Sequence, residues 1–157
     1  MKKISLICLI SCGLNLFAQK HLPAVSLKNL NGETVSVVSN FQEKDKVYVF
    51  CFWATWCSPC IHELDDISSD YADWKSKINM ELVAISVDDS RTTKRVKPLV
   101  NGKGWEYTVL LDTNQELKRG LTIANVPHTV IVKNNEIVFV KNGELSKDEL
   151  FEKLKSL

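Results

Sequence analysis

The sequence predicts one three-layer α/β/α domain with a mixed central sheet, and three segments support this fold class. Residues 47–53 and 81–87 are apolar runs of the kind that form strands buried on both faces, and a helical pattern lies between them. A strand, helix and strand in this order place the two strands in parallel. Residues 128–140 then predict an antiparallel hairpin, so the sheet contains both kinds of neighbour.

The segment ahead of the first buried strand predicts a β-hairpin at the start of the folded domain. Residues 22–27 lead to Asn31 and Gly32, a pair that is typical of a tight turn. Residues 34–37 alternate between polar and apolar side chains, which is the pattern of a strand. We therefore expect two short antiparallel strands before the crossover unit.

The helix of the crossover unit is predicted to start near Pro59 and to carry one apolar face. Proline is compatible with the first turn of a helix, where its missing N–H is not needed. Large apolar residues follow at intervals of three and four, as one helix face requires. They are Ile61, Leu64, Ile67, Tyr71 and Trp74. We expect this face to pack on the sheet.

An inserted helix and strand separate the crossover unit from the C-terminal hairpin. Residues 91–100 are a basic and weaker helix candidate, and the two glycines within 101–104 indicate a break. A short strand is expected over 107–111, followed by one or two helical turns over 115–120. The domain therefore carries a central αβ insert.

The C-terminal part predicts a hairpin and then a last helix. Strands over 128–132 and 136–140 flank Asn134 and Asn135, which tolerate the positive φ of a tight turn. Residues 146–149 begin with serine and end with glutamate, the spacing of a capping box. The apolar face of the helix that follows consists of Leu150, Leu154 and Leu157.

Composition and charge suit a single compact domain that acts on a discrete partner. The chain has 157 residues, of which 45% are hydrophobic and 25% charged. Its 20 basic and 19 acidic residues give a formal net charge of +1, without a basic stripe or an acidic tail. Composition therefore offers no reason to expect nucleic-acid binding.

The first residues form a pattern that is typical of a secretory signal peptide. Two lysines precede an apolar stretch over residues 4–17, and Ala18 provides a small residue for cleavage. The stretch is too short and interrupted for a membrane span. We expect a signal peptide over 1–18, a folded domain over 19–157, and a periplasmic or otherwise extracytoplasmic bacterial location.

A second processing route starts from the same segment. Residues 9–12 read Leu-Ile-Ser-Cys, which resembles the lipobox at which bacterial lipoproteins are cleaved and lipidated on cysteine. Cleavage before Cys12 would give a lipid-anchored membrane protein, whereas otherwise no membrane contact is expected. In the simpler interpretation, Cys8 and Cys12 are apolar residues of a signal that is discarded.

Three cysteines remain after the signal, and their arrangement predicts thiol exchange. An exported chain meets conditions in which disulfides persist, and the odd count of Cys51, Cys57 and Cys60 leaves at least one thiol free or exchanging. Cys57 falls where a strand passes into a helix, so unpaired N–H groups and the helix dipole stabilise its thiolate. Cys60 follows one turn later and resolves the mixed disulfide.

The same cysteine spacing also occurs in zinc sites and in purely structural disulfides. Zinc would need further ligands, and the chain offers only the scattered His21, His62 and His128 and no second CxxC, so no metal site is expected. A purely structural disulfide across four residues closes too small a loop to constrain the unfolded chain much. Thiol exchange remains the leading interpretation.

Residues 52–60, Phe-Trp-Ala-Thr-Trp-Cys-Ser-Pro-Cys, resemble the active site of the thioredoxin superfamily. Val126 and Pro127 resemble the cis-proline loop of that superfamily, which lies against the active-site disulfide. The resemblance implies the thioredoxin fold, a redox-active disulfide between Cys57 and Cys60, and substrate contacts by Trp56, Pro59, Val126 and Pro127.

The chain is more closely similar to the TlpA/ResA-like branch of exported thiol-disulfide oxidoreductases. The similarity rests on the Leu-Lys-Asn-Leu-Asn-Gly-Glu stretch from Leu27, on the insert over 91–112 and on Glu63. It implies that Glu63 moves protons to or from the cysteines. The alternative is a solvated acid near a helix start. Cys51 stands where thioredoxin has a buried aspartate, and we interpret it as a small core residue.

The resemblance implies an enzyme that reduces protein disulfides, including the haem-binding cysteines of apocytochromes c, and that receives electrons from an upstream membrane donor. No organic cofactor is implied, because the cysteines carry the electrons. Two alternatives remain open: a disulfide-forming oxidant, which needs a favoured reduced state, and a redox-inert binding module. A peroxiredoxin is less favoured, because its peroxidatic cysteine usually lies in another motif.

Overall fold

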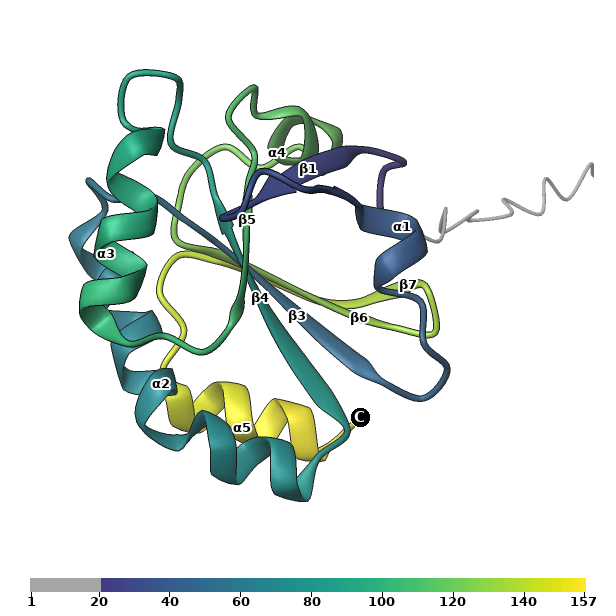
Figure 1. Ribbon diagram of the computed structural model, residues 1–157. Coiled ribbons are helices and arrows are strands. Elements are labelled where there is room, and N and C mark those ends of the chain that lie inside the picture. Colours follow the sequence, from purple (N-terminus) through teal and green to yellow (C-terminus); the bar gives the residue numbers. More distant parts are fainter. Residues whose placement is uncertain (1–20) are drawn as a thin grey trace, which may run out of the picture.

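The computed structural model describes residues 21–157, so the predicted signal peptide and Cys12 lie outside the described residues. It contains a seven-stranded sheet in the order β2-β1-β5-β4-β3-β6-β7 (Figure 1). The strands are β1 (Ser26–Asn29), β2 (Thr34–Ser36), β3 (Val47–Trp53), β4 (Met80–Ser86), β5 (Thr108–Leu111), β6 (His128–Lys133) and β7 (Glu136–Asn142). The helices are α1 (Val37–Asn40), α2 (Ser58–Lys77), α3 (Val96–Lys103), α4 (Glu116–Gly120) and α5 (Lys147–Lys155), with a 3₁₀ turn η1 (Thr93–Arg95) before α3.

The strand pairing confirms a mixed sheet. β3 pairs with β4 in parallel, and β4 pairs with β5 in parallel. β6 lies antiparallel to β3, and β7 lies antiparallel to β6. The N-terminal hairpin of β1 and β2 is confirmed, and β1 joins it to the sheet by pairing with β5 of the insert.

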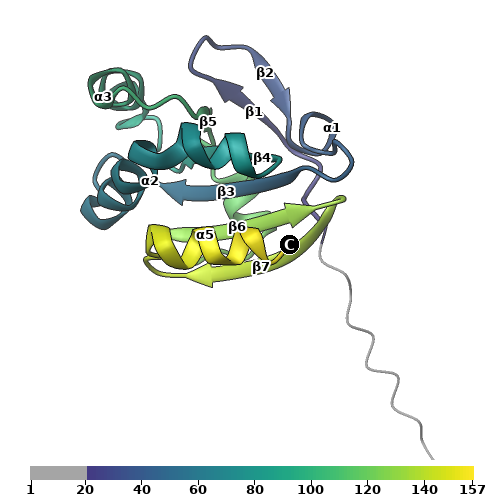
Figure 2. The ribbon, with the colours of Figure 1, turned by 90° about the horizontal axis from the view of Figure 1, so that it is seen from below.

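Helices cover both faces of this sheet. α2 and α5 lie next to one another on one face, with α3 beside the start of α2, while α1 and α4 lie on the opposite side (Figures 1 and 2). This confirms the predicted three layers. Among residues 21–157, no helix has the length and apolar character needed to cross a membrane.

The two central strands and the long helix form the core as expected. All seven residues of β3 are buried, as a strand covered on both faces requires. The predicted apolar face of α2 is buried at Leu64, Ile67, Tyr71 and Trp74. The Tyr71 hydroxyl also accepts a 3.2 Å hydrogen bond from the backbone N–H of Leu82 in β4, so the helix is tied to the sheet at a buried position.

Several predicted boundaries differ from the structure, and two of the differences have a clear local cause. The alternation over 34–37 suggested a strand, but β2 ends at Ser36, whose hydroxyl accepts from the N–H of Ser39 and caps the short helix α1. The insert helix was predicted to end at residue 100, but α3 continues to Lys103. It ends at Gly104, whose φ of 66° is the left-handed conformation that favours glycine.

The C-terminal hairpin and helix follow the predicted pattern. Asn134 and Asn135 have φ values of 51° and 65°, and they join β6 to β7. The hydroxyl of Ser146 accepts a 3.2 Å hydrogen bond from the N–H of Glu149, so Ser146 caps α5. The helix ends at Lys155, and Leu157 therefore lies beyond it rather than on its apolar face.

Candidate active site

The cysteine pair lies at the carboxyl end of β3, where the chain enters α2. Cys57 is the N-cap residue of this 20-residue helix, and Cys60 lies in its first turn. The two sulfurs form a disulfide, and the Cα atoms are 5.3 Å apart. Cys57 is therefore held where the first N–H groups of α2 lack helical partners and stabilise negative charge.

A tight turn and the start of the helix hold Cys57 in place. Its N–H donates a 3.0 Å hydrogen bond to the carbonyl of Ala54, and its carbonyl accepts a 3.2 Å hydrogen bond from Ile61. Pro59 lies in the first turn of α2, where an N–H is not required, and is exposed. The backbone on both sides of the sulfur is thus fixed.

Exposure distinguishes the residues of the motif. Cys57 is 6% exposed and Cys60 is 1% exposed, so a partner reaches the sulfur of Cys57 more easily. Trp56 is 61% exposed beside them, whereas Trp53 is 1% exposed in the core. A partner that approaches Cys57 therefore meets the indole of Trp56.

Val126 and Pro127 lie beside the end of β3. The peptide bond between them is cis, as the resemblance implied, and both residues are partly buried. His128 opens β6 and pairs with Phe52 in the register of β3, so the proline is level with the start of the cysteine motif. The structure therefore brings the predicted substrate-contact residues to the same edge of the sheet as the disulfide.

Glu63 is buried, so the interpretation of a solvated acid was wrong. It is 5% exposed on α2, one helical turn after Cys60. Its Oε2 accepts a 3.0 Å hydrogen bond from the N–H of Leu145, and its Oε1 lies 3.4 Å from the hydroxyl of Thr129. Desolvation raises the pKa of the carboxyl from 4.5 to about 7, against the opposing effect of these two hydrogen bonds.

Cys51 is a buried free thiol on the face of the sheet that Glu63 also faces, since both lie beside the Thr129 hydroxyl. It pairs with Thr129 across β3 and β6, and its sulfur lies 4.0 Å from the Thr129 hydroxyl. Burial raises the pKa of this thiol far above its ordinary value, and the charge of Glu63 adds to the rise. The geometry supports the interpretation of Cys51 as a core residue.

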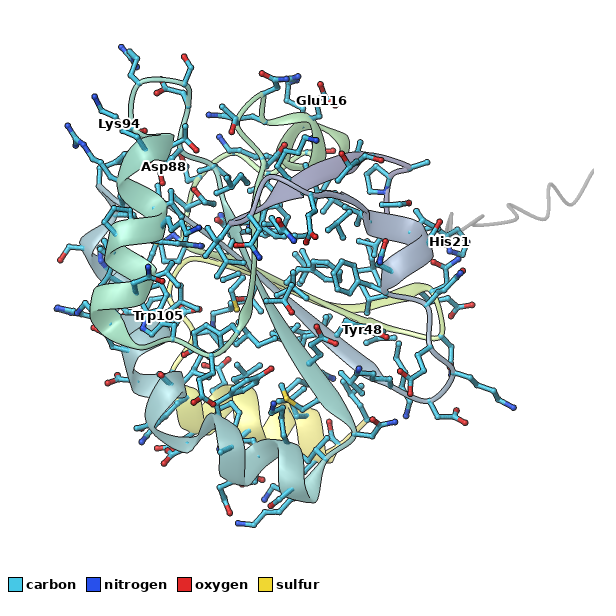
Figure 3. The ribbon with its side chains drawn as sticks, in the orientation of Figure 1. His21, Tyr48, Asp88, Lys94, Trp105 and Glu116 are labelled. Atoms are coloured by element: carbon cyan, nitrogen blue, oxygen red, sulfur yellow. A yellow bond between two sulfur atoms is a disulfide. The ribbon has the colours of Figure 1, made fainter. Side chains whose placement is uncertain are left out.

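Asp88 is a buried residue near the site that the sequence analysis did not identify. It follows β4 and is 1% exposed. Its carboxylate accepts hydrogen bonds from the N–H and hydroxyl of Thr55, which lies two residues before Cys57. Figure 3 shows Asp88 below the loop that carries Lys94 and on the same side of the molecule as Trp105. Its position directly after a buried strand was the available signal.

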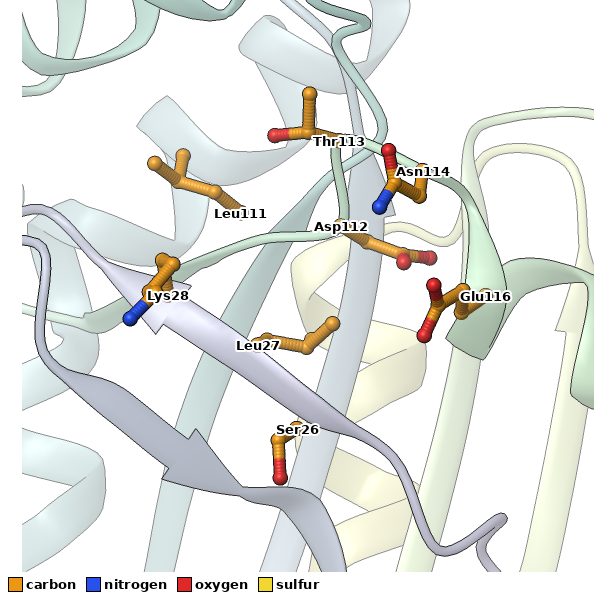
Figure 4. A pocket seen from close by; sticks show the side chains of 8 residues that line it. All are labelled: Ser26, Leu27, Lys28, Leu111, Asp112, Thr113, Asn114 and Glu116. Carbon is orange, nitrogen blue, oxygen red and sulfur yellow. The ribbon is translucent and has the colours of Figure 1, made fainter.

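Two pockets on the described part of the chain lie apart from the cysteine pair. A pocket of about 220 Å³ lies where β1, the end of β5 and α4 meet (Figure 4), but no predicted site residue lines it. Asp112, one of the two acidic residues that line it, accepts hydrogen bonds from the N–H groups of Leu117 and Lys118 and thereby stabilises the start of α4. Within residues 21–157, no group of three or more His, Cys, Asp or Glu residues is arranged to hold a metal ion.

The chain resembles characterised and structurally solved proteins along most of its length. It matches the AhpC/TSA family model over residues 18–146. It is 32% identical over 130 residues to the thiol-disulfide oxidoreductase ResA of Oceanobacillus iheyensis, covering 82% of this chain and 66% of that protein. A solved thioredoxin-like protein of Porphyromonas gingivalis is 41% identical, with a TM-score of 0.74 and coverage of 87% and 90%. StoA of Bacillus subtilis is 26% identical, with a TM-score of 0.67 and coverage of 83% and 98%.

Proposed function

Because this chain belongs to the AhpC/TSA family and is a ResA-like thiol-disulfide oxidoreductase of the thioredoxin fold, we propose that it reduces disulfides of extracytoplasmic proteins. The observation that carries the proposal is the difference between the two sulfurs. Cys57 is the more exposed and lies at the N-cap of α2, whereas Cys60 is enclosed within the helix. This suits Cys57 as the attacking thiolate and Cys60 as the resolving thiol.

The reaction exchanges one disulfide for another. The Cys57 thiolate attacks one sulfur of the partner disulfide, a mixed disulfide forms, and the other partner sulfur leaves as a thiolate that takes up a proton. The Cys60 thiolate then attacks the Cys57 sulfur and releases the second partner thiol. The partner gains two electrons and two protons, and the enzyme ends as the Cys57–Cys60 disulfide.

Glu63 is proposed to handle the proton of Cys60. Its pKa of about 7 leaves the carboxyl partly protonated at neutral pH, which suits a group that both takes and gives a proton. It lies one helical turn from Cys60 on α2 and is enclosed by the segment after β7. The carboxylate accepts the proton as Cys60 attacks, and it returns the proton when the disulfide is reduced again.

The buried surroundings support a reducing direction. Reduction of the enzyme creates a thiolate at a site where both cysteine residues are at most 6% exposed, and a low-dielectric environment disfavours that charge. The disulfide form is favoured accordingly, which makes the dithiol a reductant. The N-terminus of α2 acts in the opposite sense and would favour a disulfide-forming oxidant.

Trp56, Pro59, Val126 and Pro127 are proposed to contact the partner protein. Trp56 and Pro59 are exposed next to Cys57, and the proline loop lies at the same sheet edge. Apocytochrome c is a candidate partner, because its haem attachment site presents two cysteines separated by two residues and followed by histidine. A membrane-bound donor of two electrons would return the enzyme to its dithiol form.

The test uses two synthetic peptides. The first has two cysteines separated by two residues and followed by histidine, oxidised to its internal disulfide, and the second is a disulfide peptide without the histidine. We expect Cys60→Ala to accumulate a mixed disulfide with either peptide through Cys57, while Cys57→Ala forms none. Faster trapping of the first peptide would support apocytochrome c as a partner. Failure of Cys60→Ala to form any adduct would contradict the proposed exchange, and adducts through Cys60 would reverse the two roles.

The extracytoplasmic location is proposed from the signal pattern over residues 1–18. Expression of the full chain in a bacterium, followed by fractionation and mass spectrometry of the mature N-terminus, tests this location. A product that starts at Gln19 in the periplasm is expected. A lipidated Cys12 in the membrane fraction would establish the anchored form instead, and an uncleaved cytoplasmic chain would contradict export.

A further inference from the structure

Asp88 is a buried carboxylate that the exchange steps above do not use, and it is bonded to the turn in front of the cysteine pair. Its Oδ2 accepts a 2.8 Å hydrogen bond from the N–H of Thr55, and its Oδ1 accepts a 2.6 Å hydrogen bond from the Thr55 hydroxyl. The hydroxyl of Ser86 donates to Oδ2 at 2.9 Å. At 1% exposure, the carboxylate is enclosed by uncharged donors.

The basic residue that follows along the chain does not neutralise this carboxylate. The guanidinium of Arg91 donates to Asp89 at 2.9 Å and 2.6 Å, so it is paired with the neighbouring acid. Among residues 21–157, the salt bridges do not include Asp88. Its negative charge therefore acts on its surroundings through a poorly screening, buried environment.

The parallel pairing of β3 and β4 brings this charge close to the active site. The two strands are in register at Trp53 and Ser86, so the residues that follow them leave the sheet at the same edge. Thr55 is two residues before Cys57, and two residues span at most roughly 7 Å. With the hydrogen bond to Thr55 added, the carboxylate lies within about 10 Å of the Cys57 backbone.

We propose that Asp88 is a positioning residue of the thiol exchange. It fixes the turn over residues 54–57 through Thr55, and its charge shifts the equilibrium between the dithiol and disulfide forms of the cysteine pair toward the disulfide. The turn closes by the hydrogen bond from Cys57 to Ala54, and it carries the exposed Trp56. Holding both the N–H and the hydroxyl of Thr55 fixes how the turn presents the indole and the sulfur. The proposal rests on the proposed exchange at Cys57.

The direction of the charge effect follows from the electrons and protons. Reduction by an external dithiol transfers two electrons to the pair, breaks its S–S bond and leaves Cys57 partly as a thiolate. A carboxylate nearby repels that thiolate and does not repel the neutral disulfide. It therefore offsets the stabilisation from the N-terminus of α2 and makes the pair a stronger reductant.

Three variants separate the charge of Asp88 from its hydrogen bonds. Asp88→Asn keeps the shape: its amide oxygen can accept from the Thr55 N–H, and its NH₂ group can donate to the Thr55 hydroxyl. Thr55→Val removes the hydrogen bond from the Thr55 hydroxyl but keeps the charge of Asp88. Thr55→Ser keeps both the hydroxyl and the charge of Asp88, and is the matched control. Each variant is first checked for folding by its thermal unfolding curve.

The measurement is the equilibrium constant of the cysteine pair against a dithiothreitol buffer, together with the rate at which the reduced protein cleaves a disulfide peptide. We expect Asp88→Asn to change the equilibrium constant about three- to tenfold toward the dithiol. A tenfold change corresponds to about 30 mV for a two-electron couple. Thr55→Val should slow peptide cleavage without this shift, and Thr55→Ser should match the wild type in both.

Two outcomes would overturn the proposal. An unchanged or oppositely shifted constant in a folded Asp88→Asn variant would exclude the charge effect, and equal cleavage rates for Thr55→Val and Thr55→Ser would exclude the positioning effect. Both comparisons use folded variants, so loss of fold cannot produce them. Failure of the proposed protein-reducing function would give a different result: the reduced wild-type protein would then not cleave the disulfide peptide at all.

Discussion

The backbone N–H of Leu145 donates a 3.0 Å hydrogen bond to the carboxylate of Glu63, 82 residues earlier in the chain. The same segment donates from the N–H of Gly143 to the carbonyl of Pro127 at 3.0 Å. The segment after β7 is therefore bonded both to the buried acid of α2 and to the proline loop. This segment encloses Glu63, and its hydrogen bond from Leu145 partly offsets the rise in the carboxyl pKa that burial causes.

Replacement of Glu63 by glutamine is expected to change the pH dependence of stability. Burial raises the pKa of the native carboxyl from 4.5 to about 7, so between these values the native state holds a proton that the unfolded state has lost. Wild-type stability therefore falls as pH rises through this window. Glu63→Gln removes the effect, so its stability relative to wild type should increase by on the order of 2–3 kcal/mol from pH 5 to pH 8.

Urea unfolding of the oxidised proteins at several pH values measures this difference. Glu106→Gln is the matched control at an exposed glutamate, and it should show no comparable trend. A difference between Glu63→Gln and wild type that stays constant from pH 5 to pH 8 would show that Glu63 titrates below this range. The proposed proton transfer would then lose its support.

The position of Glu63 could be predicted from the sequence, but its burial could not. Helical spacing placed Glu63 one turn from Cys60, and this was correct. The same spacing is compatible with a solvated and with a buried side chain, because the covering residue comes from a segment 82 positions away. Asp88 escaped notice for a related reason, since its bonds to Thr55 require the ends of two parallel strands to meet.

Trp56 is expected to matter for protein partners and not for the cysteine chemistry. It is 61% exposed, so Trp56→Ala should leave the unfolding free energy nearly unchanged. Loss of a large aromatic contact should lower kcat/KM about tenfold for an oxidised protein substrate. Reduction of a small aromatic disulfide reagent is the control reaction. Equal loss in both reactions would indicate a role in the chemistry itself.

Cys51 is expected to stay unreactive in the native protein. Burial and the neighbouring Glu63 raise its pKa, and its side chain is enclosed between β3 and β6. Iodoacetamide added to the reduced native protein at pH 8 should label Cys57 and spare Cys51, as read by peptide mass spectrometry. The same treatment in urea provides the control, because it should label both. Native labelling of Cys51 at the rate of Cys57 would refute its role as a core residue.

The N-cap of α5 offers a direct test of a feature predicted from sequence. The Ser146 hydroxyl accepts a hydrogen bond from the N–H of Glu149. Ser146→Ala has no hydroxyl and therefore lacks this cap. The alanine variant is expected to lose about 1 kcal/mol of unfolding free energy, measured in urea. Ser146→Asp should keep most of the wild-type stability, because aspartate is also a good N-cap residue. Equal stability of the alanine and aspartate variants would mean that the cap contributes nothing measurable.

Local patterns predicted most of the fold because local chemistry determines the elements concerned. Asn134 and Asn135 adopt positive φ in the turn where their residue types suggested a hairpin. At the end of α3 the same reasoning was wrong, because Gly104 and not the first glycine of the 101–104 segment adopts the left-handed conformation. Pairing between β1 and β5 was not predicted, since no local pattern specifies which distant strand covers an edge.

The central claim is that the Cys57–Cys60 pair exchanges disulfides as a reductant. Its equilibrium reduction potential, measured in dithiothreitol buffers by thiol labelling of Cys57 and Cys60, tests this most directly. We predict one two-electron transition at or below the potential of thioredoxin, roughly −270 mV. A potential near about −120 mV would identify an oxidant, and a pair that could not be cycled between disulfide and dithiol would contradict the account altogether.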